Sequence, residues 1–168
     1  MKLKHYTRTP KFDLIRDWDY LTSDTRSDKP SGFWVSVEGE DDWKSWCLSE
    51  DYRLESLENE FDVILSESAN ILHLSSVEEL LKFTQDYRDS SMDAEFSRVM
   101  GRDYSYAIRW TDLYSQYDGI IIAPYQWAYR LGFNTSWYYS WDVASGCIWN
   151  LDAIDSVTKP DMSVLLNA

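Results

Sequence analysis

The sequence predicts a mixed α/β or α+β fold in one domain that spans residues 1–168. Short segments with β-branched or alternating apolar residues are interleaved with stretches in which apolar residues recur every three or four positions. These two periods are typical of strands and of amphipathic helices, respectively. No Pro-, Gly- or Ser-rich linker divides the chain, and 168 residues are enough for one hydrophobic core. We therefore expect one compact domain in which short strands and helices alternate.

The N-terminal third is predicted to contain two strands and one helix. Residues 2–7 alternate loosely and form the first strand, with His5 near its end. The polar residues 22–31 are expected to be a loop, and the apolar residues 33–37 form the second strand. A helix then begins at the acidic residues 40–42, whose charge suits a helix N-terminus.

In that helix, three residues fall at positions i, i+3 and i+4, and we expect this stripe to point inward: Trp43, Trp46 and Cys47. Residues 61–65 and 70–74 are β-like segments. Ser76 and Glu79 form a capping-box pattern that begins a helix over residues 77–84.

The C-terminal half is predicted to alternate between the two kinds of element. Residues 88–105 are polar and weakly patterned, so we expect a surface insertion that is partly helical. Residues 110–117 show helical spacing and lead into a buried strand at residues 120–123. Two aromatic β-like segments follow, at residues 137–141 and 146–149.

Composition restricts the possible functions. The formal net charge of −13 argues against an extended nucleic-acid surface, because phosphate binding depends on clustered Lys and Arg. The same charge suits a partner with a basic patch, and an imitation of DNA would have a similar composition. No run of about eighteen apolar residues and no signal-peptide pattern occurs, so we expect a cytoplasmic protein without membrane association.

Most cysteine and aromatic residues of the chain are expected to have structural roles. Cys47 and Cys147 lack the spacing of a zinc site or a disulfide framework, so we expect two reduced, buried thiols and no bound metal. Nine Trp and twelve Tyr are mainly expected to build the core. Such an aromatic content also suits a carbohydrate-binding module, although those modules commonly belong to secreted chains.

Four short motifs carry the strongest functional signal. They are KHYT at residues 4–7, GFWVS at 32–36 followed by a helix, YDGI at 117–120, and GCIW at 146–149. Their order resembles the ADP-ribosyltransferase superfamily, in the branch that carries His on the first strand. The resemblance covers most of the chain and implies a split β-sheet core flanked by helices. It also implies NAD as the substrate and transfer of ADP-ribose to a protein or nucleic-acid acceptor.

The resemblance assigns roles to residues of the first two motifs. In that family the first-strand His hydrogen-bonds the nicotinamide ribose, and the next residues contact the nicotinamide amide through backbone groups. An aromatic residue of the second motif stacks on the nicotinamide ring. By position these residues are His5, Tyr6, Thr7 and Trp34.

Two further polar residues suit the rest of the substrate. Ser36 ends the second strand at the entrance to the helix, where its hydroxyl can donate to the ribose or to a phosphate. Arg8 is a candidate phosphate partner, because guanidinium groups bind phosphate oxygens in pairs.

The catalytic carboxylate is less clearly marked. Cleavage of the bond between nicotinamide and ribose passes through an oxocarbenium-like state, which a nearby negative charge stabilises. In the family an acid stands at the start of the late strand, but Ser145 occupies that position here. Asp142, three residues earlier, is the best candidate, and it reaches the position only with a bulge or a changed register.

Two functions of different class therefore remain open. The first is an NAD-using ADP-ribosyltransferase, as found in toxins, phage proteins that modify a host, or defence systems. The second is a non-enzymatic interaction protein on the same fold, of the inhibitor or DNA-mimic type. The missing acid at residue 145 and the charge of −13 favour the second function.

Overall fold

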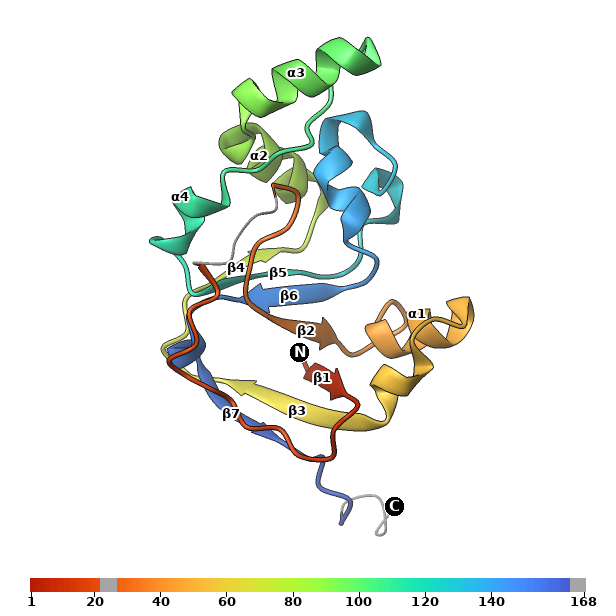
Figure 1. The fold of residues 1–168 in the computed structure, drawn as a ribbon, viewed down its shortest axis with the longest axis vertical. Coiled ribbons are helices and arrows are strands. Elements are labelled where there is room, and N and C mark those ends of the chain that lie inside the picture. Colours follow the sequence, from red (N-terminus) through yellow and green to blue (C-terminus); the bar gives the residue numbers. More distant parts are fainter. Residues whose placement is uncertain (22–26, 164–168) are drawn as a thin grey trace.

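The structure, a computed structural model, describes residues 1–21 and 27–163. Within these residues one mixed seven-stranded sheet has the order β4-β5-β6-β2-β1-β3-β7, which confirms the α+β class (Figure 1). The pair β4 and β5 is parallel, and the other pairs are antiparallel. The strands are β1 (Leu3–Thr7), β2 (Phe33–Val37), β3 (Asn59–Leu65), β4 (Ile71–Leu74), β5 (Gly119–Ile122), β6 (Ser145–Ile148) and β7 (Ile154–Thr158).

Most helical segments gather at one end of the sheet. In Figure 1, α2, α3 and α4 lie beyond β4, β5 and β6, whereas α1 lies beside β2. The α-helices are α1 (Trp43–Glu50), α2 (Val77–Tyr87), α3 (Ser90–Met100) and α4 (Trp110–Tyr114). The 3-10 segments are η2 (Leu54–Leu57), η3 (Trp127–Tyr129), η4 (Phe133–Ser140) and η5 (Leu151–Ala153). The described residues include no helix that is long and apolar enough to cross a membrane.

The predicted capping box at the start of α2 is confirmed. The Ser76 hydroxyl accepts the N–H of Glu79, and the Glu79 carboxylate accepts the N–H of Ser76. Each residue satisfies a backbone donor that the helix itself leaves without a partner.

The sheet opens between β1 and β2. Register pairs join β1 to β3 at five positions and β2 to β6 at four, but β1 to β2 at only two, Leu3 with Val37 and Lys4 with Ser36. The two strands therefore separate beyond Lys4. At this opening, His5 of the KHYT motif lies next to the backbone of Trp34 in the GFWVS motif.

Both faces of the central strands are buried. On β5, Ile120 and Ile122 belong to the cluster under the helices, while Ile121 belongs to a second cluster on the other face. This alternation follows from the two-residue period of a strand. It also explains why β5 is a continuous apolar run, since neither of its faces meets water.

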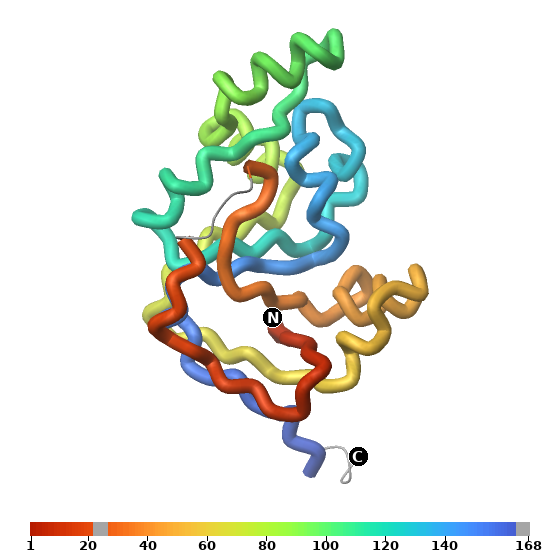
Figure 2. Tube along the Cα trace, viewed as in Figure 1, coloured from red at the N-terminus to blue at the C-terminus, as the bar shows by residue number. Residues whose placement is uncertain are grey.

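The segment after β1 covers the second cluster. In Figure 2 it runs beside β3 and β7 before it turns back toward β2. Arg16 fixes it there by donating to the carbonyl oxygens of Leu151, Ile154 and Asp155.

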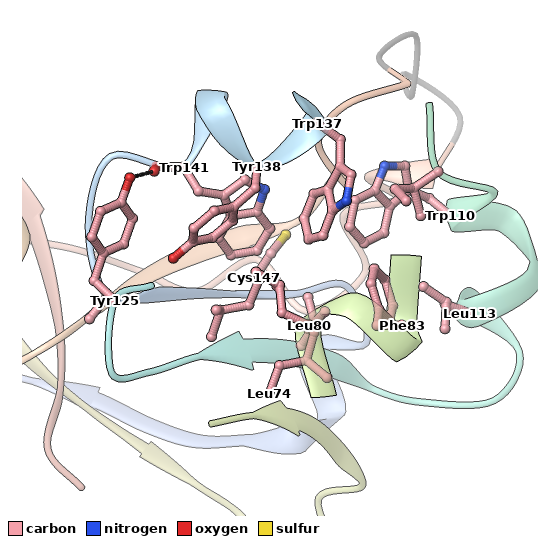
Figure 3. Close-up of a cluster of buried hydrophobic side chains, with 14 of the residues drawn as sticks. Leu74, Leu80, Phe83, Trp110, Leu113, Tyr125, Trp137, Tyr138, Trp141 and Cys147 are labelled. Carbon is pink, nitrogen blue, oxygen red and sulfur yellow. Dashed lines mark hydrogen bonds between the residues drawn. The ribbon is translucent and has the colours of Figure 1, made fainter. Parts of the chain in front are cut away.

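The prediction of a strand at residues 137–141 is wrong, because most of this segment belongs to the 3-10 helix η4. Trp137, Tyr138 and Trp141 are all fully buried and point toward α2 and β6 (Figure 3). The Trp137 indole N–H donates to the hydroxyl of Thr84 on α2. Packing of these rings on α2 outweighs the strand preference of aromatic residues.

One further prediction is corrected by the structure, and one is confirmed. The helix predicted over residues 110–117 ends at Tyr114. The segment at residues 88–105 is partly helical, as predicted: it contains α3, which is capped at both ends. The buried Asp93 of α3 accepts the backbone N–H groups of Tyr106 and Ala107. Strand β7 was not predicted.

The stripe of the first helix was predicted to point inward, and this is right for one of its three residues. Cys47 is buried, as Cys147 is, but Trp43 and Trp46 are only half-buried. Of the loop predicted at residues 22–31, residues 22–26 lie outside the described residues, and residues 27–31 contain no helix or strand.

Candidate functional site

A cavity of about 420 Å³ lies at the opening between β1 and β2. This volume is within the range of small-molecule sites, about 300–1,000 Å³. Its walls come from β1, β2, the start of α1, the segment before β2, and the chain that leads into β6. Six of the eight residues predicted for the site line it: His5, Tyr6, Trp34, Ser36, Asp142 and Ser145.

The other two predicted residues do not line this cavity. The Thr7 hydroxyl is engaged by Thr9, through both its backbone and its side chain. The Arg8 guanidinium forms an exposed ion pair with Glu55. Both residues lie at or beyond the end of β1, where the chain turns away from β2.

His5 is linked to Trp34 through the backbone, and its ring does not face the indole. The imidazole lies against Phe33, with ring centroids 4.3 Å apart, and near Phe12 at 5.0 Å. Its Nδ1 is 2.9 Å from the Trp34 carbonyl oxygen. Neighbouring residues of a strand point to opposite faces, so a histidine that packs on Phe33 is separated from the side chain of Trp34.

This hydrogen bond defines the tautomer of His5. A carbonyl oxygen only accepts, so Nδ1 carries the proton. Burial lowers the pKa of His5 below its ordinary value of 6.5, and the bond to the Trp34 carbonyl opposes that effect in part. The ring is therefore neutral at pH 7, which leaves Nε2 as a hydrogen-bond acceptor.

Trp34 presents a half-buried ring in the cavity. The ring meets the edge of Trp141 at a centroid distance of 4.9 Å and an angle of 66°. The Lys29 ammonium lies over the indole, 5.0 Å from its centroid. The cavity therefore already contains an aromatic ring that accepts a cation on its π-system.

Three more aromatic residues that line the cavity are Tyr6, Trp43 and Trp141. Trp141 is almost fully buried, and its indole N–H has no hydrogen-bond partner within the described part of the chain. Burial, together with the carboxylates of Glu60 and Asp42, raises the pKa of Tyr6, so its phenol stays protonated. These rings favour a ligand with a flat, unsaturated group.

Asp142 brings a carboxylate to the cavity. Its Oδ1 accepts a hydrogen bond from the Arg130 guanidinium at 3.1 Å, which holds the side chain in one orientation. Ser145 lies at the start of β6, opposite Ser36 of β2, and its hydroxyl donates to the carbonyl of Val143. The Ser36 hydroxyl accepts the N–H of Trp43 and so joins β2 to α1.

Basic side chains also line the cavity, in a strongly acidic protein. They are Lys4, Lys29 and Arg53. The Lys4 ammonium contacts Glu60 and Asp62 at 2.6 Å each and Glu38 at 3.4 Å. Burial by itself lowers the pKa of Lys4, but the hydrogen bonds to Asp62 and Glu60 raise it overall, so Lys4 remains charged.

Sequence reasoning missed eight residues of the cavity wall: Lys4, Lys29, Pro30, Val35, Trp43, Arg53, Val143 and Trp141. Lys4 and Val35 belong to the motifs, and Trp43 lies in the helix that follows GFWVS, so closer attention to these residues could have found them. Lys29 and Arg53 lie in loops where no pattern distinguishes them. Trp141 was assigned to a strand, so its contact with Trp34 was not foreseen.

Comparison of the chain with protein-family models, with curated proteins and with solved structures finds no match. A function is therefore inferred from the geometry of the cavity and from the motifs that meet there.

Proposed function

We propose that this chain is an ADP-ribosyltransferase-like enzyme, which binds NAD in the cavity between β1 and β2 and transfers ADP-ribose to a macromolecular acceptor. One observation carries the proposal. Six residues, four from the first two motifs and two from the segment before the late strand, come from three distant parts of the sequence, and all six line a single cavity of suitable volume. The family resemblance was based on sequence motifs alone, so this convergence is independent support.

Trp34 is proposed to hold the nicotinamide ring. The nicotinamide of NAD carries a positive charge, and the indole already has the Lys29 ammonium 5.0 Å from its centroid. A flat cation can therefore replace or share this contact. Lys29 and Arg53 line the same cavity and are proposed to contact the diphosphate.

His5 is proposed to orient the ribose. Because Nδ1 donates to the Trp34 carbonyl, Nε2 is free to accept a hydrogen bond from a ribose hydroxyl. Its lowered pKa keeps this acceptor unprotonated at neutral pH.

Asp142 is proposed to stabilise the positive charge that develops on the ribose. The bond between the anomeric carbon and the nicotinamide nitrogen breaks, and its electron pair stays on that nitrogen. The acceptor nucleophile forms the new bond to the anomeric carbon and loses its proton to solvent. Arg130 positions the Asp142 carboxylate through the ion pair at 3.1 Å.

The test uses NAD labelled in its nicotinamide. Release of label is measured with and without a cell lysate as acceptor, and NAD binding is measured by calorimetry. Asp142→Asn is expected to lower release by about 100-fold or more while binding changes little, as when one stabilising group of a transition state is removed. Asp155→Asn alters an exposed carboxyl outside the cavity and serves as the matched control. Absence of both NAD binding and nicotinamide release in the unaltered protein would contradict the proposal.

A non-enzymatic interaction protein is the second candidate. The observation that favours it is the start of β6, where Ser145 bears no carboxylate and Asp142 is already paired with Arg130. Such a protein would bind its partner with an affinity that falls steeply as salt is added, and His5→Ala would leave that affinity unchanged.

A further inference from the structure

Next to the cavity, three aromatic side chains form a partly exposed group that we name the α1 aromatic surface: Trp43, Trp46 and Tyr52. The Trp43 and Trp46 rings stack at 5.3 Å with an angle of 20°, and Tyr52 meets Trp46 edge-on at 5.2 Å. Trp43 also lines the cavity, so this surface is continuous with it. Tyr52 is 44% exposed, and the two tryptophans are half-buried.

The backbone holds Tyr52 in place by an unusual conformation. Asp51 and Arg53, its two neighbours, both have left-handed φ angles, 50° and 46°. The N–H groups of Asp51 and Tyr52 both donate to the Cys47 carbonyl at the end of α1. This tight turn directs Tyr52 to the tryptophans and brings Arg53 to the cavity wall. Non-glycine residues in this conformation are uncommon, and they concentrate at binding and catalytic sites.

The segment that carries this surface is the most acidic part of the chain. Residues 38–62 contain ten acidic and two basic residues, a net charge of −8 out of −13 for the whole protein. Several of these carboxylates are exposed on α1 and on either side of it, including Glu40, Glu50 and Glu55. Lys4, Lys29 and Arg53 line the cavity, whereas these exposed carboxylates belong to the segment that contains α1. A small anionic ligand inside and a basic macromolecule outside would both meet complementary charge.

We propose that the α1 aromatic surface docks an arginine-bearing segment of the acceptor protein. A guanidinium stacks flat on Trp or Tyr and pairs with carboxylates through two parallel hydrogen bonds, so arginine uses both features of the surface. A nucleic acid is a less suitable partner, because its phosphates would be repelled by the net charge of −8. A second copy of this chain would bring a similar negative charge and would also be repelled. The identity of this partner as the acceptor depends on the proposed NAD chemistry, but the docking itself does not.

The test measures the binding of a fluorescent hexa-arginine peptide by anisotropy, without NAD. Trp46 lies outside the cavity wall, and Trp46→Ala is expected to weaken binding about fivefold, the loss of one cation–π contact. Hexa-lysine is expected to bind more weakly than hexa-arginine and to be less sensitive to this variant. A labelled single-stranded oligonucleotide is expected not to bind. Circular dichroism checks folding, and Tyr52→Ala replaces Trp46→Ala if that variant unfolds.

Charge variants provide a matched comparison. Glu40→Lys with Glu50→Lys reverses two exposed charges near the α1 aromatic surface, and binding is expected to fall more than tenfold. Glu67→Lys with Glu95→Lys makes the same change of net charge at exposed positions in the turn after β3 and on α3, and binding is expected to fall less than threefold. Equal losses in both double variants would mean that the peptide responds only to total charge. Such a result, or tight binding of the oligonucleotide, would overturn the proposal.

NAD binding is measured on the same proteins, which separates the two proposals. Arginine docking without NAD binding would overturn the proposed enzyme function and leave the docking surface intact. NAD cleavage that is unaffected by Trp46→Ala, in a protein that does not bind hexa-arginine, would overturn the docking surface alone.

Discussion

Replacement of Trp34 by alanine removes the ring on which the nicotinamide is proposed to stack. The indole is half-buried. The Lys29 ammonium lies 5.0 Å from its centroid, which shows that the ring can bind a cation. Cation–π contacts contribute about 0.5–1 kcal/mol when exposed and about 2 kcal/mol when desolvated, so the half-buried ring should contribute about 1–2 kcal/mol. The dissociation constant of NAD is therefore expected to rise about five- to thirtyfold in Trp34→Ala.

The assay compares NAD with ADP-ribose by calorimetry at pH 7.5. ADP-ribose lacks the nicotinamide, so its affinity is expected to stay within about twofold in Trp34→Ala, while that of NAD falls. Trp34→Phe keeps a ring and should recover most of the loss. Trp18→Ala removes an exposed indole outside the cavity and should change neither affinity. Equal weakening of NAD and ADP-ribose, or no weakening of either, would refute the stacking role of Trp34.

The same substitution also affects stability, which the assay must take into account. Trp34→Ala loses the edge contact with Trp141 at 4.9 Å. A buried Trp→Ala change costs about 3–5 kcal/mol, and for this half-buried ring we expect about 2 kcal/mol. Binding is therefore measured well below the melting temperature of the variant, so that both proteins are folded.

Two further predictions concern the stability of the fold around the site. Because burial lowers the pKa of His5, its contribution to stability is complete above pH 6.5 and is lost as pH falls, when the unfolded chain takes up a proton that the folded chain resists. In urea titrations between pH 7.5 and 5.5, the free energy of unfolding should fall more in the unaltered protein than in His5→Gln, and equal slopes would contradict the buried neutral ring. A Cβ at Gly146 would lie 2.6 Å from Ile121 Cγ1 and 2.8 Å from the Ile120 oxygen. Gly146→Ala should therefore lower the free energy of unfolding by about 1–3 kcal/mol, and unchanged stability in thermal melts would be evidence against this close approach.

Several parts of the fold were determined by local sequence. The capping box at Ser76 and Glu79 predicted the start of α2, because both hydrogen bonds form within one turn. The GFWVS motif predicted β2, and the acidic residues after it predicted a helix. Asp42, one of these acidic residues, caps α1 by accepting the N–H of Ser45. Such features depend on residues three or four positions apart, so the sequence alone contains them.

Other parts depended on contacts between distant segments. The aromatic residues of η4 suit a strand by propensity, but burial of Trp137 against Thr84 and of its neighbours under α2 makes this segment a 3-10 helix. Trp43 and Trp46 have the spacing of an inward stripe, yet they remain half-buried and form part of a surface. Periodicity predicts which residues share a face, but it does not tell how much of that face another element covers.

The candidate site combines both kinds of information. By itself the sequence determined which residues are proposed to bind NAD, in motifs at residues 4–7 and 32–36 and near residue 145. Only the tertiary structure decided that β1 and β2 separate after two register pairs, that His5 contacts the Trp34 carbonyl and not its ring, and that Lys29 and Arg53 complete the wall. The physical reason is that strand pairing and loop packing join residues up to about 140 positions apart, and these long-range contacts leave no periodic signal in the chain.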